Sequence, residues 1–161
     1  MQLFGSLFQK IDKTLYVQIW QSRIKVTDAK GEVVFDEAPL IAVKALADGR
    51  KQVEAVGNAA LSCIGDCIEV IRPFQHPRTL LADFVHAEEL LKYVFAKAFN
   101  GCLIRPSPRV IVHPMEKLEG GLTPIERRAL HELAQGAGAR WVHVHEGPVL
   151  HIVDGQIVGY T

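Results

Sequence analysis

The sequence predicts an α/β domain built on a mixed sheet, and three observations support this prediction. Residues 14–20, 23–28 and 31–37 have the composition of three short strands joined by tight turns, which is typical of an antiparallel meander. Residues 86–99 place apolar side chains at helical spacing. Residues 106–148 then give a strand, a loop, a helix and a strand, the unit that sets two parallel strands side by side beneath a crossover helix. The predicted sheet therefore combines antiparallel and parallel pairing.

The helix within residues 106–148 has an explicit start signal. Thr123 can accept from first-turn amides, Pro124 stands where its missing N–H costs nothing, and Glu126 completes a Thr-x-x-Glu capping box. Apolar residues then recur at spacings of three and four, which predicts that one face of the helix covers the sheet. They are Ile125, Ala129, Leu130, Leu133, Ala134 and Ala137. Glycines end the helix, and an extended alternation resumes at residue 141.

A smaller insertion is predicted between the meander and the first long helix. Residues 40–47 and 52–56 read as a hairpin, and residues 58–63 as a helical turn. Near the C-terminus, apolar runs flank Asp154-Gly155, which predicts a closing hairpin. A meander followed by helix, strand, helix and strand is the order of the ribonuclease H-like, actin-type α/β core. We therefore expect one domain of this class over residues 1–161.

The composition narrows the classes of partner. Hydrophobic residues make up 48% of the 161 residues and charged residues 22%, which indicates an ordered globular protein. The formal net charge of zero argues against binding to nucleic acid through bulk charge. Three scattered cysteines fit a reducing cytosol and are expected to be buried or inert. No run approaches the ~20 apolar residues of a membrane span and no signal peptide is evident, so we expect a cytoplasmic protein.

The first twelve residues predict a short amphipathic helix. Its apolar positions are Leu3, Phe4, Leu7, Phe8 and Ile11, with lysines and glutamines elsewhere. Such a stripe has two plausible destinations, the protein's own domain or a membrane interface with lysines near the lipid headgroups. Because interfacial insertion of a few side chains gives weak attachment, several copies would be needed to hold firmly.

Histidines suggest an alternative chemistry. His143 and His145 are two residues apart on a predicted strand and point to one face, with His151 nearby, so they could chelate a metal. Together with Glu146 they would form the cluster of a metal-dependent hydrolase. A metal site needs a third ligand and oriented outer partners, and no signature motif supplies them, so an ordinary polar strand face is the favoured interpretation. No catalytic residue is predicted.

Motifs spread along the chain carry a resemblance to a known family. They are Phe4-Gly5-Ser6-Leu7-Phe8, Ala55-Val56-Gly57, Ile71-Arg72-Pro73, Ala82-Asp83-Phe84, Arg105-Pro106-Ser107-Pro108-Arg109-Val110, Ile125-Glu126-Arg127-Arg128-Ala129 and Ala134-Gln135-Gly136-Ala137-Gly138-Ala139-Arg140. Over roughly residues 3–150 the chain resembles the N-terminal half of MreB proteins, the bacterial actin homologues that organise rod shape. The resemblance implies an actin-type subdomain with a small insertion at about residues 38–68. It also favours peripheral inner-membrane attachment by residues 1–12.

Departures from the family pattern shape the functional prediction. Where the family's first phosphate loop has Asp-Leu-Gly-Thr, this chain has Gln18, Ile19, Trp20 and Gln21, and the tryptophan would fill the space of a phosphate. Of the family's Glu-Glu-Pro segment only Glu146 remains. The resemblance also implies that the second phosphate loop lies beyond this chain. We therefore expect no cofactor, no ATP binding and no ATPase activity.

The function predicted from these residues is that of a truncated, MreB-like, cell-shape-related protein that acts by binding as a pseudo-ATPase. Its expected partners are the inner-membrane surface, full-length MreB or other shape and division proteins, with homo-oligomers also open. Two alternatives remain at this point. One is the metal-dependent hydrolase on a ribonuclease H-like core, and the other is a decayed paralogue without activity.

Overall fold

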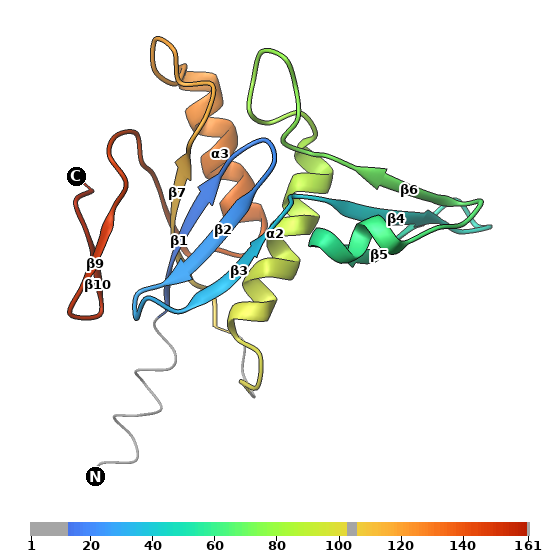
Figure 1. Cartoon of the computed structure of the whole chain (residues 1–161), viewed down its shortest axis with the longest axis horizontal. Helices are drawn as coiled ribbons and strands as arrows, with labels where there is room; N and C mark the ends of the chain where they lie inside the picture. The colour runs from blue at the N-terminus through green and yellow to red at the C-terminus, as the bar shows by residue number, and fades with distance from the viewer. Residues whose placement is uncertain (1–12, 103–105, 161) are drawn as a thin grey trace.

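The computed structural model describes residues 13–102 and 106–160, so the predicted N-terminal helix lies outside the described residues. Five strands form the main sheet in the order β3-β2-β1-β7-β8. They are β1 (Thr14–Ile19), β2 (Ile24–Asp28), β3 (Val33–Glu37), β7 (Arg109–Pro114) and β8 (Trp141–Val144). The first three form an antiparallel meander, whereas β7 runs parallel to β1 and β8 parallel to β7. The predicted mixed sheet is confirmed (Figure 1).

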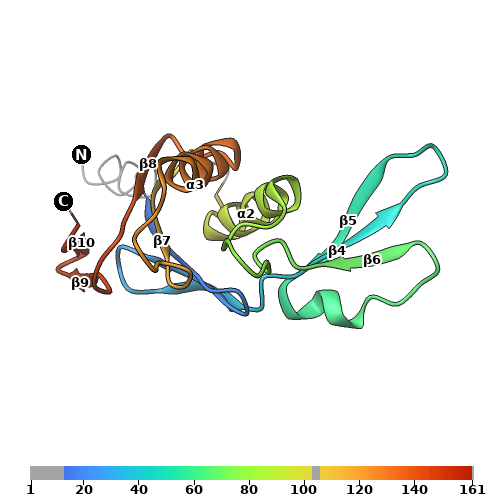
Figure 2. The ribbon, with the colours of Figure 1, turned by 90° about the horizontal axis from the view of Figure 1, so that it is seen from above.

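Two helices cover one face of this sheet. They are α2 (Phe84–Ala98) and α3 (Pro124–Gly136), and Figure 2 shows both on the same side of the strands. Because side chains alternate along a strand, every second residue of β1 and β7 points to them, including Leu15, Val17 and Val112, which are fully buried. The helices contribute Leu90, Leu91, Val94, Leu130 and Leu133 to the same core. This packing fixes the strand order that places the candidate site.

The predicted capping box of α3 is present. Glu126 N–H donates to Thr123 Oγ1 at 3.2 Å, and Thr123 N–H donates to Glu126 Oε2 at 2.9 Å. The predicted apolar face is only partly correct, because Ile125 is 81% exposed. Its side chain borders a small pocket with Leu80 and Leu81 of the loop before α2. The first turn of α3 therefore faces that loop, and the sheet-covering face begins with Leu130.

Substitution of Thr123 by alanine is expected to cost about 1 kcal/mol of unfolding free energy, the usual value of a lost N-terminal cap. Hydrogen bonds from the Thr123 side chain and backbone also lower the pKa of Glu126. A carboxyl group with a lowered pKa stabilises the fold above its unfolded pKa of about 4.3, and that contribution is lost as the pH falls. Urea titrations of Thr123→Ala should therefore show a larger loss of unfolding free energy near neutral pH than in acid.

Thr123→Ser keeps the cap and serves as control. Equal losses for both variants would contradict the assignment.

A second, smaller sheet projects from the first, as Figure 1 shows at the right. It contains β4 (Ile41–Ala45), β5 (Lys51–Val56) and β6 (Ile68–Ile71) in the order β5-β4-β6, with a 3-10 helix η1 (Gly57–Ser62). The predicted hairpin and helical turn are confirmed. The third strand, β6, lies where no strand was predicted, and it pairs antiparallel with β4. That residues 38–68 form a subdomain of their own stays a prediction.

The C-terminal tail covers the opposite face of the main sheet. Its hairpin, β9 (His151–Val153) and β10 (Gln156–Val158), turns at Asp154-Gly155 as predicted. Leu150 and Ile157 of the tail pack with Tyr16 and Ile111 of the sheet in a separate small cluster. None of the helices in the described part of the chain is long and apolar enough to cross a membrane.

Candidate functional site

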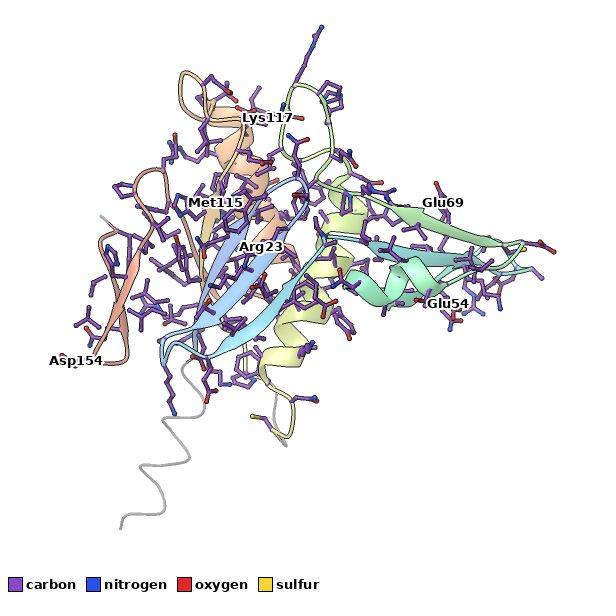
Figure 3. The ribbon with its side chains drawn as sticks, in the orientation of Figure 1. Arg23, Glu54, Glu69, Met115, Lys117 and Asp154 are labelled. Atoms are coloured by element: carbon purple, nitrogen blue, oxygen red, sulfur yellow. The ribbon has the colours of Figure 1, made fainter. Side chains whose placement is uncertain are left out.

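Three chain segments meet at one end of the main sheet. Since β1, β7 and β8 are parallel, the residues that follow each of them emerge at the same edge, where ligands of open α/β sheets commonly bind. The segments are the turn 20–23 between β1 and β2, the loop 115–123 between β7 and α3, and residues 145–150 after β8. Figure 3 labels Arg23, Met115 and Lys117 in this region. The sequence-predicted residues 18–21 and 146 are all placed here.

The turn after β1 is held by the loop after β7. Gln21 N–H donates to Glu116 Oε2 at 2.8 Å, and the buried Gln18 amide approaches Met115 Sδ at 3.8 Å. Trp20 N–H donates to the Arg23 carbonyl at 2.8 Å. The Arg23 guanidinium lies 5.4 Å from the Trp20 ring centroid, a cation–π distance. Gln18, Trp20 and Gln21 therefore each contact a neighbouring residue at this end of β1, and their role in binding a phosphate group stays a prediction.

Glu146 is anchored by the start of α3. Its Oε2 accepts from Leu122 N–H at 2.9 Å, and its Oε1 pairs with the Arg127 guanidinium. The side chain is about a quarter exposed, so it keeps access to solvent. Carboxylates thus occupy one backbone amide in each of two strand-end loops, Gln21 through Glu116 and Leu122 through Glu146. A phosphate group reaching either amide has to displace a carboxylate.

Lys117 connects this edge to the loop before α2. Its ammonium donates to the Pro77 carbonyl at 3.0 Å, and its backbone φ of 61° lies in the left-handed region. Lysine adopts this conformation at a cost, which local contacts have to offset. The loop after β7 is therefore fixed from both sides, by Glu116 toward β1 and by Lys117 toward residues 72–82.

Histidines gather on the sheet face that the tail covers. The His143 and His145 ring centroids are 6.3 Å apart, and His145 lies 4.6 Å from His113 in an edge-to-face arrangement. His151 stands apart on the exposed hairpin. In the described ranges no group of three His, Cys, Asp or Glu residues could hold a metal ion. The alternative metal cluster of His143, His145 and His151 thus gains no support from the described residues.

Burial sets the protonation of this histidine face. It lowers the pKa of His113, and the neighbouring His145 acts in the same direction. It lowers the pKa of His143 as well, with smaller contributions from His145 and Arg127. Burial also raises the pKa of Tyr16, against a hydrogen bond from Leu150. His113 and His143 are therefore favoured as neutral imidazoles, and Tyr16 as a neutral phenol, near neutral pH.

Sequence reasoning missed Tyr16 and His113, which are the centre of this cluster. Tyr16 Oη lies 2.6 Å from His113 Nδ1, although 97 residues separate them in the chain. The alternation of β1 and β7 alone places each on a definite face. Their proximity follows only from the parallel register, in which Tyr16 faces Ile111 and Gln18 faces His113.

Comparisons with known proteins agree on one family. A family model described as MreB/Mbl protein matches residues 15–157. The cell shape-determining protein MreB of Haemophilus influenzae is 31% identical over 159 residues, covering 94% of this chain and 44% of that protein. MreB of Escherichia coli K12 is 37% identical over 125 residues, covering 74% of this chain and 34% of that protein. The chain thus spans less than half the length of these curated relatives.

Solved structures show the same fold. MreB5 of Spiroplasma citri bound to ADP superposes with a TM-score of 0.63 at 22% identity, covering 85% of this chain and 39% of that chain. A MamK double helical filament superposes with a TM-score of 0.60 at 17% identity, covering 83% of this chain and 40% of that chain. At these identities the likeness concerns the fold, and it confirms the actin-like class predicted from the order of elements.

These matches contradict the prediction that the chain is not an enzyme. That prediction rested on Gln18, Trp20 and Gln21 in place of the phosphate loop, on Glu146 as the remnant of an acidic segment, and on a second phosphate loop beyond this chain. The family match over residues 15–157 and the curated relatives are to MreB proteins, which are actin-like ATPases, and the differences at these positions do not show that the motifs are lost. A family model that covers most of the chain, together with relatives above 30% identity, leads to a single conclusion: this chain belongs to the MreB/Mbl family.

Proposed function

We propose that this chain is a cell-shape-related cytoskeletal protein that works by assembling with copies of itself or with a full-length MreB-type protein. The observation that carries the proposal is the strand order β3-β2-β1-β7-β8 with three loops converging at one end. Two solved relatives with this fold add support. One is a MamK double helical filament, and another is MreB5 of Spiroplasma citri bound to AMPPNP.

We further propose that the converging loops form one wall of a nucleotide-responsive site. Gln18, Trp20 and Gln21 would lie on one side of it and Glu146 on the other. The Gln21 amide is engaged by Glu116, so a phosphate group would need this carboxylate to turn away. Removing the negative charge of Glu116 should therefore favour an approaching anion, because a like-charge repulsion disappears.

The test is sedimentation of the purified chain, alone and with a purified MreB-type protein, with and without ATP and Mg²⁺. The expected result is a faster-sedimenting species whose amount changes with nucleotide. Glu116→Gln should bind a fluorescent ATP analogue more tightly than the unchanged chain, and Glu119→Gln, on an exposed residue of the same loop, is the matched control. Absence of self-association and of co-sedimentation in every condition would overturn the proposal and favour a decayed paralogue.

We also propose peripheral attachment to the cytoplasmic face of the inner membrane. The support is the sequence pattern of Leu3, Phe4, Leu7, Phe8 and Ile11, which suits the interface of a bilayer. The double variant Phe4→Glu/Phe8→Glu is expected to lose most co-sedimentation with vesicles that contain anionic lipid.

Burial of each phenylalanine side chain contributes at most about 1.5–3 kcal/mol to membrane binding, so removing two of them removes a large share of a weak binding free energy. Substituting the polar positions Gln2 and Gln9 by glutamate controls for added charge. Equal binding by both double variants would contradict the attachment.

A further inference from the structure

The tail is held to the main sheet by a chain of three hydrogen bonds that passes through His113. Leu150 N–H donates to Tyr16 Oη at 3.2 Å. Tyr16 Oη lies 2.6 Å from His113 Nδ1, and His113 Nε2 lies 3.1 Å from the Gly147 carbonyl oxygen. Both ends of this chain are tail backbone groups, and both middle members are buried side chains of the sheet.

The end groups fix the direction of every bond in the chain. The Gly147 carbonyl can only accept, so His113 carries its proton on Nε2. His113 Nδ1 is then an acceptor and takes the Tyr16 O–H, whose oxygen takes the Leu150 N–H. All donors and acceptors are satisfied only while His113 is neutral. A protonated imidazole carries a hydrogen on both nitrogens, so Nδ1 can no longer accept and the Tyr16 O–H loses its acceptor in this chain of hydrogen bonds.

A second histidine, His145, also contacts the backbone of the tail. His145 Nε2 lies 2.9 Å from the Pro148 carbonyl oxygen, and its ring meets the His113 ring edge-to-face. His143 lies beside His145 and packs against Trp141 and Tyr160, the latter from the tail. Three imidazoles therefore stand in a row under the tail, and a positive charge on one raises the cost of charging the next.

No carboxylate in the described residues is placed to compensate such a charge. Glu146 follows His145 directly, but its oxygens are engaged by Leu122 and Arg127 on the α3 side. The other charged groups on this face include Arg109, whose guanidinium lies over the Trp141 ring at 4.6 Å, and Lys25, opposite Gln18 on β2. Asp36 on β3 lies opposite Lys25, and its carboxylate is engaged by the Arg23 guanidinium. The tail itself contributes His151 and Asp154, which are both exposed.

We propose that Tyr16, His113 and His145 form a protonation-sensitive clasp that holds residues 147–160 on the sheet and releases them when His113 takes a second proton. Release uncovers the apolar side chains of Tyr16 and Ile111, which pack against Leu150 and Ile157 while the clasp is closed. The clasp is a conformational device of the tail and stands independently of the proposed function.

The surroundings of His113 determine whether docking of the tail strengthens or weakens as the pH falls. Burial, then His145, lowers the pKa of His113 in the closed state, so the open state binds the proton more readily. Docking of the tail is therefore strongest above the ordinary histidine pKa of about 6.5 and weakens as the pH falls below it. Each unit by which the closed-state pKa is lowered corresponds to about a tenfold change in the docking equilibrium.

Hydrogen–deuterium exchange of the full chain tests the clasp. Between about pH 7.5 and about pH 5.5, after correction for the intrinsic rate, amides of residues 147–158 are expected to exchange roughly tenfold faster or more. Amides of residues 14–28 in the sheet should keep their protection over the same range. Tail exchange that does not change while the sheet stays folded would overturn the proposal.

Variants separate the clasp from general acid sensitivity. His113→Gln cannot take up a proton and should remove the pH dependence of tail exchange, whereas His131→Gln, at an exposed position of α3, should leave it intact. A pH response of the tail that persists in folded His113→Gln would refute the proposal. If His113→Gln does not fold, nitrogen-15 NMR of the unchanged chain decides. His113 is expected as the Nε2–H tautomer at neutral pH and should titrate together with tail release, and separate titrations would overturn the clasp.

Discussion

Replacing Phe74 by alanine is expected to lower the free energy of unfolding by about 3–5 kcal/mol, the range for removing a fully buried phenylalanine. The Phe74 side chain has no solvent exposure and belongs to the same core cluster as α2, α3 and the main sheet. It lies in the connection between β6 and α2, so its ring anchors the segment that leads from the small sheet back to the main core.

Local backbone bonds explain why this site cannot collapse easily around the missing ring. The Pro73 carbonyl accepts from Ala82 N–H at 2.8 Å and from Asp83 N–H at 3.0 Å, which closes the loop of residues 74–82. A cavity that cannot be filled by relaxation costs the most, because the lost contacts are not replaced. Phe74→Leu, which keeps much of the volume, should therefore lose clearly less stability than Phe74→Ala.

Urea unfolding followed by tryptophan fluorescence measures this loss. Phe84→Ala is the matched control, because Phe84 is 37% exposed at the first position of α2 and its truncation should cost about 1 kcal/mol or less. Similar losses for Phe74→Ala and Phe84→Ala would show that Phe74 does not hold the core together.

Several elements could be predicted because their signals are local. Thr123, Pro124 and Glu126 indicate the start of α3, and Asp154-Gly155 indicates the turn of the tail hairpin. The predicted position of each agrees with the structure within a residue or two. The strand β6 was missed because it has only four residues and alternates weakly, and its pairing with β4 comes from a partner far along the chain. The burial of Phe74 was not predicted, because nothing in a loop sequence reveals that one side chain points into the core.

In the candidate site, too, some features could be predicted from local signals and others could not. Positions 18–21 and 146 could be placed at strand ends from the order of elements, yet the partners that hold them, Glu116 and Leu122, depend on loop conformation. The prediction of a non-enzyme failed for a related reason. It weighed local differences, in the turn after β1 and at Glu146, and the part of the family pattern beyond this chain more heavily than a resemblance that covers most of the chain.

Substitution of Gly57 by alanine is expected to cost about 2–4 kcal/mol of unfolding free energy, from backbone strain together with the loss of a charged hydrogen bond. Gly57 has a φ of 75°, which L-residues with a side chain rarely adopt. An added Cβ would overlap the Glu37 carboxylate and approach the Phe35 ring to 3.0 Å. The carboxylate cannot simply move away, because its Oε2 accepts from Asn58 N–H at 2.7 Å.

Gly57 lies at the junction between the two sheets, so its substitution should destabilise both of them. Glu37 ends β3 of the main sheet, while Gly57 and Asn58 begin η1 beside the small sheet, and Gly57 N–H donates to the Leu40 carbonyl at 2.8 Å. Gly49→Ala is the matched control. Gly49 has a similar φ of 83° but nothing within 4 Å of an added Cβ, so strain alone should cost about 1 kcal/mol. Thermal and urea unfolding of both variants measures the difference. Equal losses would mean that strain accounts for the whole effect and that the Glu37 contact adds nothing to holding the small sheet in place.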